Sequence, residues 1–196
     1  MQSLRAAVDQ EAERRRFSGV VRLERAGDVE LCAAYGYADR AHGIANTVET
    51  LFATASGSKG LTALAVLGLV ERGTLTLETP ARSLLGDDLP LIGADVTVEH
   101  LLAHRSGIGD YLDEDGDGDI TDRVLRVPVS ELAATEEFLT VLDGHPRVFR
   151  AGERFAYNDA GYVVLALLAE RASGTDFHDL VRTTAVSYTH LTLPTN

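Results

Sequence analysis

A serine and a lysine three residues apart could act together as a nucleophile and its base. They stand in the segment Ser56-Gly57-Ser58-Lys59, and Lys59 is the only lysine in a chain that contains seventeen arginines. An arginine side chain stays charged in a protein, whereas a partly buried lysine can lose its proton and then accept one from a serine hydroxyl. The lone lysine therefore points to covalent chemistry at Ser56.

The residues that follow predict a helix that would position this pair. Residues 60–73 are apolar on nearly every face and end in Gly73, which indicates a buried helix opened by Ser56. Side chains three residues apart share one face of a helix, so the Lys59 amine could reach the Ser56 hydroxyl. The free N–H groups at a helix start also favour an anion, which would supply part of an oxyanion hole.

Two simpler interpretations of these four residues compete with catalysis. The pattern Ser-x-x-Lys is short enough to recur by chance, and Ser56 could merely cap a helix that displays a solvated Lys59. A phosphate-binding loop of the Walker type fits less well, because Ser58 stands where that loop needs a glycine. A second motif elsewhere in the chain is needed to decide between these interpretations.

The rest of the sequence predicts one domain, or two interleaved layers, of the α/β class in which helices dominate. Hydrophobic periodicity, turn residues and capping residues mark the elements that would hold the reactive pair. The expected elements are a helix over the first sixteen residues, strands at 19–24 and 29–31 around a turn at 26–28, and helices at 97–104, near 135–142 and at 161–171 before Gly174.

Composition narrows the classes of partner. The formal net charge of −12 on 196 residues would repel phosphate backbones and anionic lipid, so we expect no nucleic acid and no membrane as partner. The first sixteen residues lack the apolar stretch of a secretory signal, and no apolar run could span a bilayer, so we expect a cytoplasmic location. The single cysteine, Cys32, is expected to be a buried strand thiol rather than a nucleophile.

Two further segments supply the second motif. Residues 97–108 contain Leu101-Leu102-Ala103-His104-Arg105-Ser106-Gly107, and residues 152–162 contain Phe155-Ala156-Tyr157-Asn158-Asp159-Ala160-Gly161-Tyr162. Together with residues 52–59, and in this order, they resemble the motifs of the serine β-lactamase-like hydrolases. That family includes class C β-lactamases, penicillin-binding D-Ala-D-Ala carboxypeptidases, D-aminopeptidases and β-lactamase-like carboxylesterases. The resemblance covers residues 17–184.

The resemblance implies a fold and a set of roles. The fold would be β-lactamase/transpeptidase-like, an α+β arrangement in which helices flank an antiparallel sheet, with an inserted all-α lobe. Ser56 would be the acylated nucleophile, Lys59 would take or steer its proton, and Tyr157 would be a second base that serves the leaving group and water. A nearby ammonium favours such a phenolate, although a tyrosine alone is more often a packed ring with one hydrogen-bond partner. The resemblance implies no cofactor.

The chain departs from the family pattern at two points that bear on activity. Asp159 stands where the Tyr-x-Asn motif has asparagine, and its carboxylate could hold Lys59 as a cation and weaken it as a base. No Lys-Thr-Gly or His-x-Gly segment follows Tyr157, although in the family this strand supplies the second oxyanion donor. We therefore interpret residues 1–184 as a partial hydrolase domain without its C-terminal strands, and expect that it turns over no substrate as it stands. Residues 185–196 are predicted to be a non-native tail.

The predicted function is that of a serine hydrolase that forms an acyl-enzyme at Ser56. Its substrate would be a small molecule or a peptide, namely an ester, an amide or a D-amino-acid peptide. Of the possible activities, that of an esterase or peptidase is favoured. The main alternative is a non-catalytic binding protein on the same scaffold, in which Asp159 and the missing strand have ended turnover. The sequence does not indicate an oligomeric state.

Two other patterns could suggest a metal. Residues 113–122 resemble a calcium loop, but Val124 stands where that loop needs a glutamate, so an acidic surface loop is favoured over a calcium-dependent interaction module. His100 and His104 lie one helical turn apart, yet Leu101 occupies the place of the glutamate that a zinc protease helix needs. We therefore predict no metal site.

Overall fold

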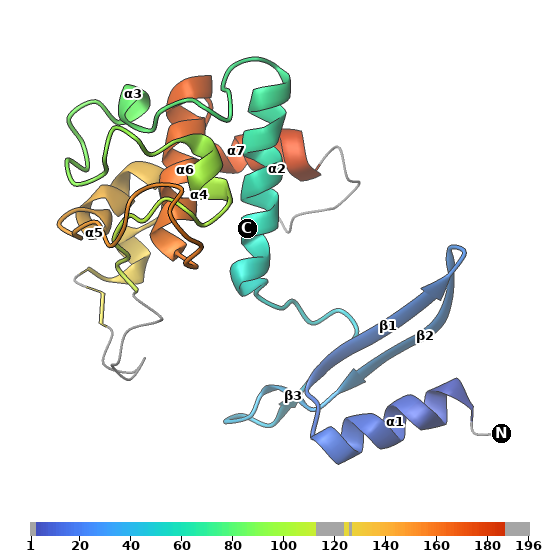
Figure 1. Ribbon diagram of the computed structural model, residues 1–196. Coiled ribbons are helices and arrows are strands. Elements are labelled where there is room, and N and C mark those ends of the chain that lie inside the picture. The colour runs from blue at the N-terminus through green and yellow to red at the C-terminus, as the bar shows by residue number, and fades with distance from the viewer. Residues whose placement is uncertain (1–2, 113–123, 126, 187–196) are drawn as a thin grey trace. The chain divides into compact units, whose positions relative to one another are not determined.

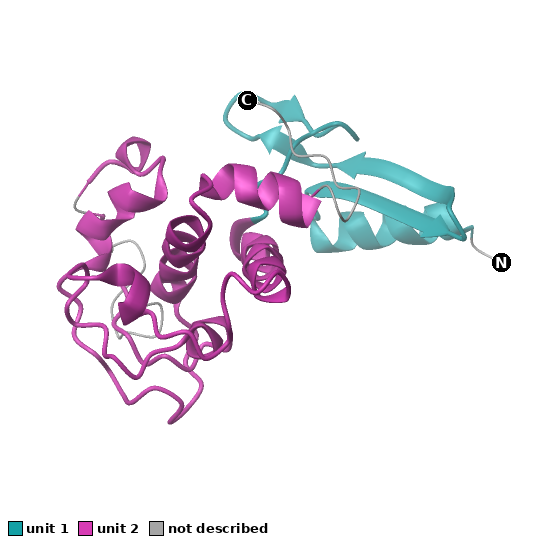
Figure 2. Ribbon diagram, turned by 90° about the horizontal axis from the view of Figure 1, so that it is seen from above, with its two compact units in different colours: residues 1–54 teal, residues 55–196 magenta. Residues whose placement is uncertain are grey.

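The computed structural model describes residues 3–112, 124–125 and 127–186, which belong to two compact units (Figure 1). The first unit comprises residues 1–54 and the second comprises residues 55–196 (Figure 2). The boundary lies directly before Ala55. Ser56 and Lys59 therefore both belong to the second unit.

The first unit is built from one helix and two small antiparallel sheets. Helix α1 (Leu4–Arg15) begins after Ser3, whose hydroxyl accepts a hydrogen bond from the Ala6 N–H, and ends at Arg16 in the left-handed conformation. The strands are β1 (Gly19–Arg25) paired with β2 (Asp28–Tyr35), and β3 (Tyr37–Asp39) paired with β4 (Ile44–Ala45). The predicted opening helix and hairpin are confirmed, and the second hairpin strand is longer than predicted.

Local conformation explains the β1–β2 hairpin, whereas strands β3 and β4 were not predicted. Ala26 and Gly27 join β1 to β2 with φ angles of 50° and 92°, a left-handed turn that suits the twist of a hairpin. The register shifts between Leu23 and Glu24 and leaves Glu30 without a counterpart, which marks a bulge in β2. Strands as short as β3 and β4 leave no readable alternation of polar and apolar residues, so the sequence does not predict them.

The expectation of a buried Cys32 is wrong. Side chains along β2 alternate between the two faces of the strand, so Leu31 and Ala33 are buried whereas Cys32 between them is exposed and free. Alternation shows which residues share a face of a strand, but the sequence of one hairpin does not show which face is covered.

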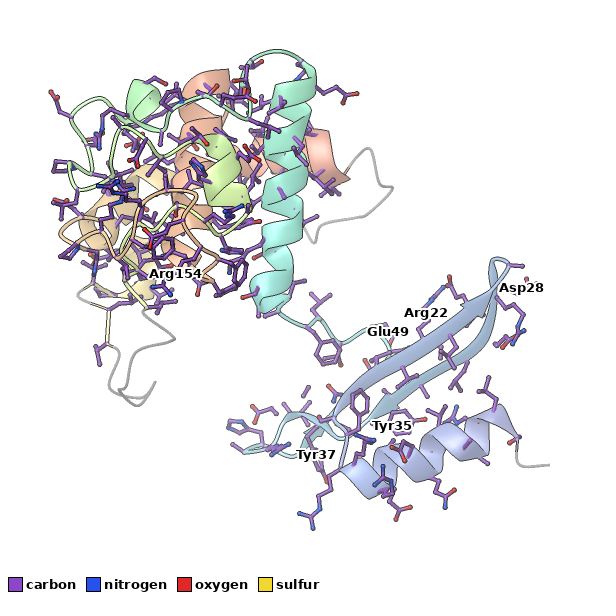
Figure 3. All side chains as sticks on the ribbon, viewed as in Figure 1. Arg22, Asp28, Tyr35, Tyr37, Glu49 and Arg154 are labelled. Atoms are coloured by element: carbon purple, nitrogen blue, oxygen red, sulfur yellow. The ribbon has the colours of Figure 1, made fainter. Side chains whose placement is uncertain are left out.

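Tyr35 at the end of β2 joins the hairpin to α1 (Figure 3). Its hydroxyl donates a hydrogen bond of 2.7 Å to the Asp9 carboxylate, and its ring meets the Phe17 ring edge-on with centroids 6.1 Å apart. The hydrogen bond between the two side chains lowers the pKa of Asp9 and raises the pKa of Tyr35. This pair therefore holds a neutral phenol against a carboxylate.

The second unit is a helical body built around α6. Its described helices are α2 (Ser58–Glu71), α3 (Arg82–Leu85), α4 (Val98–Leu102), α5 (Leu139–Leu142), α6 (Asp159–Ser173) and α7 (Phe177–Val181), with 3₁₀ turns η1 (Ala55–Gly57), η3 (Val129–Glu131) and η4 (Thr135–Phe138) and a π-helical turn η5 (Arg182–Val186). Helix α6 lies beside α2 and also contacts α4 and α7 (Figure 1). Val164, Leu165, Leu167 and Leu168 of α6 are fully buried. The apolar face of α6 is therefore the centre of the core.

Helix α6 extends beyond the predicted range of 161–171 because both of its ends are capped. The Asn158 Oδ1 accepts a hydrogen bond of 2.6 Å from the Gly161 N–H, and Gly174 ends the helix with a φ of 66°. The Asn158 Nδ2 also donates a hydrogen bond of 3.1 Å to the Ile108 carbonyl. Asn158 thus ties the start of α6 to the loop that follows α4.

Helix α2 begins two residues later than predicted and is buried on one face only. Gly57 takes the capping position, and Ser56 lies in the preceding turn. The buried residues are Thr62, Ala65, Val66 and Leu69. Leu64 and Leu67 are 45 % and 44 % exposed, so the described residues cover only one face of the predicted buried helix. When a helix is apolar on every face, its sequence does not show which face packs against the core.

Helix α4 confirms the helix predicted at 97–104 and ends in a defined turn. The Thr97 side chain accepts a hydrogen bond from the His100 N–H, and the His100 Nδ1 accepts one from the Thr97 N–H. At the other end, the His104 N–H bonds to the Leu101 carbonyl and the Arg105 N–H bonds to the His100 carbonyl, which is the Schellman arrangement. His104 itself adopts the left-handed conformation with a φ of 53°.

The last described residues pack into the core. Ala185 and Val186 of η5 are buried among the apolar residues of the second unit. Residues 187–196 and residues 113–122 lie outside the described residues. The predicted boundary after Thr184 and the interpretation of the acidic segment as a surface loop therefore stay predictions.

Candidate active site

Ser56 lies in the η1 turn, directly before α2. The preceding residue, Ala55, has a φ of 44°, a left-handed conformation that costs roughly 1–2 kcal/mol for a residue other than glycine. The Ser58 hydroxyl donates a hydrogen bond of 2.8 Å to the Ala55 carbonyl, which fixes the turn. Backbone strain that the surrounding structure holds in place is common beside reactive side chains.

Ser56, Lys59 and Tyr157 meet at one point. The Ser56 Oγ accepts a hydrogen bond of 3.2 Å from the Lys59 Nζ and one of 2.8 Å from the Tyr157 hydroxyl, although Tyr157 is 101 residues away in the chain. The Lys59 side chain is only 16 % exposed. The alternative interpretation, in which Ser56 only caps a helix and Lys59 is solvated, does not fit this geometry.

Asp159, the first residue of α6, forms an ion pair with Lys59. Its carboxylate, which is 13 % exposed, also lies 3.4 Å from the Tyr157 hydroxyl oxygen, as the longer of two acceptors for the single phenolic proton. Burial lowers the pKa of Lys59, but hydrogen bonds with Asp159 and Tyr157 outweigh it, so the pKa of Lys59 is raised overall. Lys59 is therefore an ammonium at neutral pH and donates a hydrogen bond to Ser56. The predicted contact between Asp159 and Lys59 is present in the structure.

Tyr157 differs from two other tyrosines around the site. Burial raises the pKa of Tyr111 to about 12 and also raises the pKa of Tyr162, so both stay neutral phenols at physiological pH. The Tyr162 hydroxyl donates a hydrogen bond of 3.0 Å to the Leu102 carbonyl. The Lys59 Nζ lies 4.9 Å from the centroid of the Tyr157 ring and 5.9 Å from that of the Tyr162 ring. Of these three tyrosines, Tyr157 is the one whose hydroxyl makes a hydrogen bond to Ser56.

Sequence reasoning missed Asp110, which supports the site from the loop after α4. Its carboxylate accepts a hydrogen bond of 2.6 Å from the Asp159 N–H and one of 3.1 Å from the Leu112 N–H. It therefore binds a backbone N–H of the first turn of α6, where helix N–H groups have no partner within the helix. An aspartate beside a glycine looks like any turn residue in a sequence, so no local signal could have identified it.

Ser56, Lys59 and Asp159 line a pocket of about 510 Å³ within the second unit. A volume of this size is typical of a site for a small organic molecule. The rest of the wall is mainly apolar, and its larger members are Tyr111, Leu112, Leu132, Phe138, Val163 and Phe177. Thr135 and His178 are among the polar residues of this wall. Of the described lining residues, only Lys59 and His178 can carry a positive charge.

The side chains that could have bound metal have other partners. The His100 Nδ1 lies 3.1 Å from the Thr97 hydroxyl, and the His104 Nδ1 accepts a hydrogen bond from the Asn158 N–H. Within residues 3–112, 124–125 and 127–186 there is no group of three or more His, Cys, Asp or Glu residues that could hold a metal ion. In the same ranges, the structure contains no helix with the length and apolar character needed to cross a membrane.

Comparison with known proteins identifies the family of this chain. The family model described as Beta-lactamase matches residues 4–187. The chain is 38 % identical over 178 residues to esterase EstB of Burkholderia gladioli and 31 % identical over 173 residues to penicillin-binding protein 4* of Bacillus subtilis strain 168, with 87 % of this chain covered in each case. A crystal structure of a penicillin binding protein from Bacillus halodurans matches 95 % of this chain with a TM-score of 0.83 and 34 % identity.

These matches confirm the predicted β-lactamase/transpeptidase-like fold. The chain spans only part of each relative, namely 45 % of EstB, 36 % of penicillin-binding protein 4* and 59 % of the Bacillus halodurans chain. It therefore corresponds to between about a third and three fifths of the length of these proteins.

Proposed function

We propose that this chain, which belongs to the Beta-lactamase family, carries the acylation site of a serine hydrolase. The observation that carries the proposal is the position of the Ser56 Oγ, which accepts hydrogen bonds from both Lys59 and Tyr157 beside a pocket of substrate size. A hydroxyl held between an amine and a phenol becomes a nucleophile once one of them removes its proton.

In the proposed reaction the Ser56 Oγ attacks the carbonyl carbon of an ester or amide. The serine proton passes to Tyr157 as a phenolate, or to Lys59 as a neutral amine, and from there to the leaving alcohol or amine. The bond between the carbonyl carbon and the leaving group breaks, and an ester of Ser56 remains. A water molecule then attacks this ester, gives its proton to the same base, and the acid departs as Ser56 regains a proton. N–H groups at the start of α2 would stabilise the oxyanion.

The Asp159 carboxylate controls how easily Lys59 can act as the base. It raises the pKa of Lys59, which disfavours the neutral amine. Acylation at neutral pH should therefore be slower than it would be with asparagine at position 159, and it should accelerate as the pH rises.

The pocket favours an ester with an uncharged, largely apolar acyl group. Its wall follows α6 from Asp159 to Ala166, seven positions or about 10 Å of helix, and is mostly apolar elsewhere. Lys59 is already paired with Asp159, and no arginine is among the described lining residues, so the described wall offers no spare strong cation to a substrate carboxylate. The similarity to esterase EstB supports an ester, and the similarity to penicillin-binding proteins supports an amide as the next substrate class.

Covalent labelling with a fluorophosphonate probe tests the proposal. Intact-mass spectrometry should find one adduct at Ser56 in the 196-residue chain and no adduct in Ser56→Ala. Ser83→Ala is the matched control, because the Ser83 hydroxyl bonds to the Pro80 carbonyl away from the pocket, and it should label normally. Hydrolysis of p-nitrophenyl acetate, measured also on the protein continued through its natural coding sequence, reports turnover. A folded chain of either length that forms no adduct at Ser56 would overturn the proposal.

A binding protein without turnover is the second candidate function, and the Lys59–Asp159 ion pair is the observation that favours it. In that case the chain would bind esters in the pocket reversibly and form no adduct. Labelling of Asp159→Asn separates the two candidates, because a binding protein disabled by this carboxylate should gain an adduct at Ser56 when the carboxylate is removed.

A further inference from the structure

His104 occupies a position at which glycine would be easier to accommodate. It follows the last turn of α4 in the left-handed conformation, with a φ of 53°, where a Schellman ending usually has glycine. A side chain is disfavoured in this conformation because its Cβ approaches the following carbonyl oxygen. The imidazole must therefore make contacts that offset this penalty and that a glycine could not make.

The contacts of His104 converge on Tyr157. The His104 carbonyl accepts a hydrogen bond of 2.9 Å from the Ala156 N–H, and its Nδ1 accepts one of 3.2 Å from the Asn158 N–H. The imidazole also packs on the Tyr157 ring, with centroids 4.6 Å apart and planes inclined by 31°. One residue thus holds the backbone on both sides of Tyr157 as well as the ring between them.

The imidazole is itself held in place by neighbouring aromatic rings. The Tyr162 ring packs against it with centroids 4.9 Å apart, and the Phe155 ring meets it edge-on at 5.9 Å. The Tyr162 hydroxyl bonds to the Leu102 carbonyl of α4. His104 is therefore clamped by rings that belong to α6 and to the segment before it, so its own orientation is fixed.

We propose that His104 is a positioning residue for Tyr157, which a neutral imidazole holds within hydrogen-bonding distance of Ser56. The Asn158 N–H requires a lone pair on Nδ1, so the proton of the neutral ring is on Nε2. The kinetic consequence rests on the proposed function, whereas the orientation of the Tyr157 ring does not depend on any reaction.

The charges around His104 favour the neutral ring. Burial lowers the pKa of His104, and the Lys59 ammonium lowers it further, while Asp159 and Asp110 oppose this shift. As the pH falls through this lowered pKa, a proton on Nδ1 would remove the acceptor for the Asn158 N–H and release Tyr157. At pH values above the pKa of His104, the imidazole keeps its hydrogen bond to the Asn158 N–H and Tyr157 stays in place. The titratable groups that face the imidazole are Lys59, Asp110, Tyr157, Asp159 and Tyr162.

His104→Gly tests the proposal, because glycine suits the left-handed position and leaves a gap of imidazole size beside Tyr157. In the 196-residue chain we expect the rate of fluorophosphonate labelling at Ser56 to fall roughly ten- to a hundred-fold, with a small change in melting temperature. Added imidazole should restore much of the rate in His104→Gly and have no effect on wild type. His145→Gly is the matched control, since His145 is partly buried and bonds to the Val141 carbonyl, and it should show neither loss nor rescue.

A second measurement reads the orientation of Tyr157 without any reaction. In a chain with ¹³C-labelled tyrosine, the Tyr157 signal is assigned by its disappearance in Tyr157→Phe. It should lose the ring-current shift of the imidazole in His104→Gly and regain it with added imidazole. A wild-type chain that never labels would refute the proposed function, and the NMR result would then decide the role of His104 alone.

An unmoved Tyr157 signal in His104→Gly, or full labelling in that variant without imidazole, would overturn the proposal. If His104→Gly does not fold, His104→Asn replaces it, because asparagine also tolerates the left-handed conformation but has no ring to stack. The same two results in His104→Asn would overturn the proposal equally.

Discussion

Each unit of the molecule contains a tyrosine whose hydroxyl meets an aspartate, but the two pairs differ in their neighbours. Tyr35 in the first unit donates to Asp9 at 2.7 Å, and the resulting hydrogen bond raises the pKa of the phenol. Tyr157 in the second unit lies 3.4 Å from Asp159 and makes its shorter hydrogen bond, 2.8 Å, to Ser56. Each aspartate also pairs with a cation, Asp9 with the guanidinium of Arg5 and Asp159 with the amine of Lys59.

The difference lies in whether the neighbours can exchange a proton. Asp9 pairs with Arg5, whose guanidinium stays protonated, so Tyr35 remains a hydrogen-bond donor between a strand and a helix. Tyr157 lies beside an amine and a hydroxyl, those of Lys59 and Ser56, and in the proposed reaction both can exchange a proton with it. We expect perturbations of Lys59 and Tyr157 to affect acylation, and perturbations of Tyr35 to affect stability.

The largest expected effect comes from Lys59→Arg, which keeps the positive charge but removes the ability to accept a proton. We expect Ser56 labelling to fall by roughly a hundred- to ten-thousand-fold while the fold is retained, since this is the usual contribution of a general base. The rate of fluorophosphonate labelling and the melting temperature are measured together. Labelling close to wild type in a folded Arg variant would show that Lys59 acts through its charge alone.

Replacing each tyrosine by phenylalanine compares the two pairs directly. We expect Tyr157→Phe to slow labelling by roughly a hundred-fold or more without a large loss of stability, because it removes only the proton carrier. Tyr35→Phe should label at the wild-type rate and lower the melting temperature slightly. Both variants are measured in one labelling assay and one thermal scan, and equal labelling rates in the two would remove the distinction between them.

Asp159→Asn should make the second pair more reactive, by roughly ten-fold for each unit by which it lowers the pKa of Lys59. The pKa of Lys59 is raised in the folded protein, so acylation should increase with pH toward that pKa. Removing the carboxylate should move this rising limb to lower pH. Labelling rates between pH 6 and 10 test the shift, and a variant that is slower at every pH would mean that Asp159 is an adapted part of the site.

The smallest expected effect concerns stability in the first unit. The lowered pKa of Asp9 contributes stability that is lost as the pH falls below its ordinary value of 3.8, and the raised pKa of Tyr35 contributes stability that is lost as the pH rises above 10.0. The melting temperature of Tyr35→Phe should therefore lie slightly below that of wild type between these limits and converge with it outside them. Thermal scans from pH 3 to pH 11 test this, and a difference independent of pH would assign the effect to packing against Phe17.

Local signals in the sequence predicted much of this architecture. Thr97 and Gly174 mark helix ends through capping, and the apolar pattern of α6 is long enough to read without tertiary information. The four residues Ser56, Lys59, Tyr157 and Asp159 were selected because their chemistry fits a known set of motifs, and the fold brings them into contact.

Other features depend on contacts that no local pattern encodes. Asp110 meets the start of α6 from 49 residues away, and the pocket wall combines residues of η4 and α7 with α6. The spacing of His100 and His104 does not show which atoms they contact, and the turn at the end of α4 sends each imidazole to a different backbone N–H. The exposed face of α2 and the exposed Cys32 were also not predictable from local sequence, because burial depends on which other elements cover a surface.

The enclosed amine of Lys59 also makes the site addressable by spectroscopy without any mutation. Apart from the chain's own α-amino group, it is the only amine available to reductive methylation, because every other basic side chain that could compete is a guanidinium or an imidazole. A ¹³C-dimethyl group attached there would give one side-chain resonance in this 196-residue chain. Its chemical shift would follow the ion pair with Asp159 as the pH changes, and the arrival of a ligand in the pocket would be visible in the same signal.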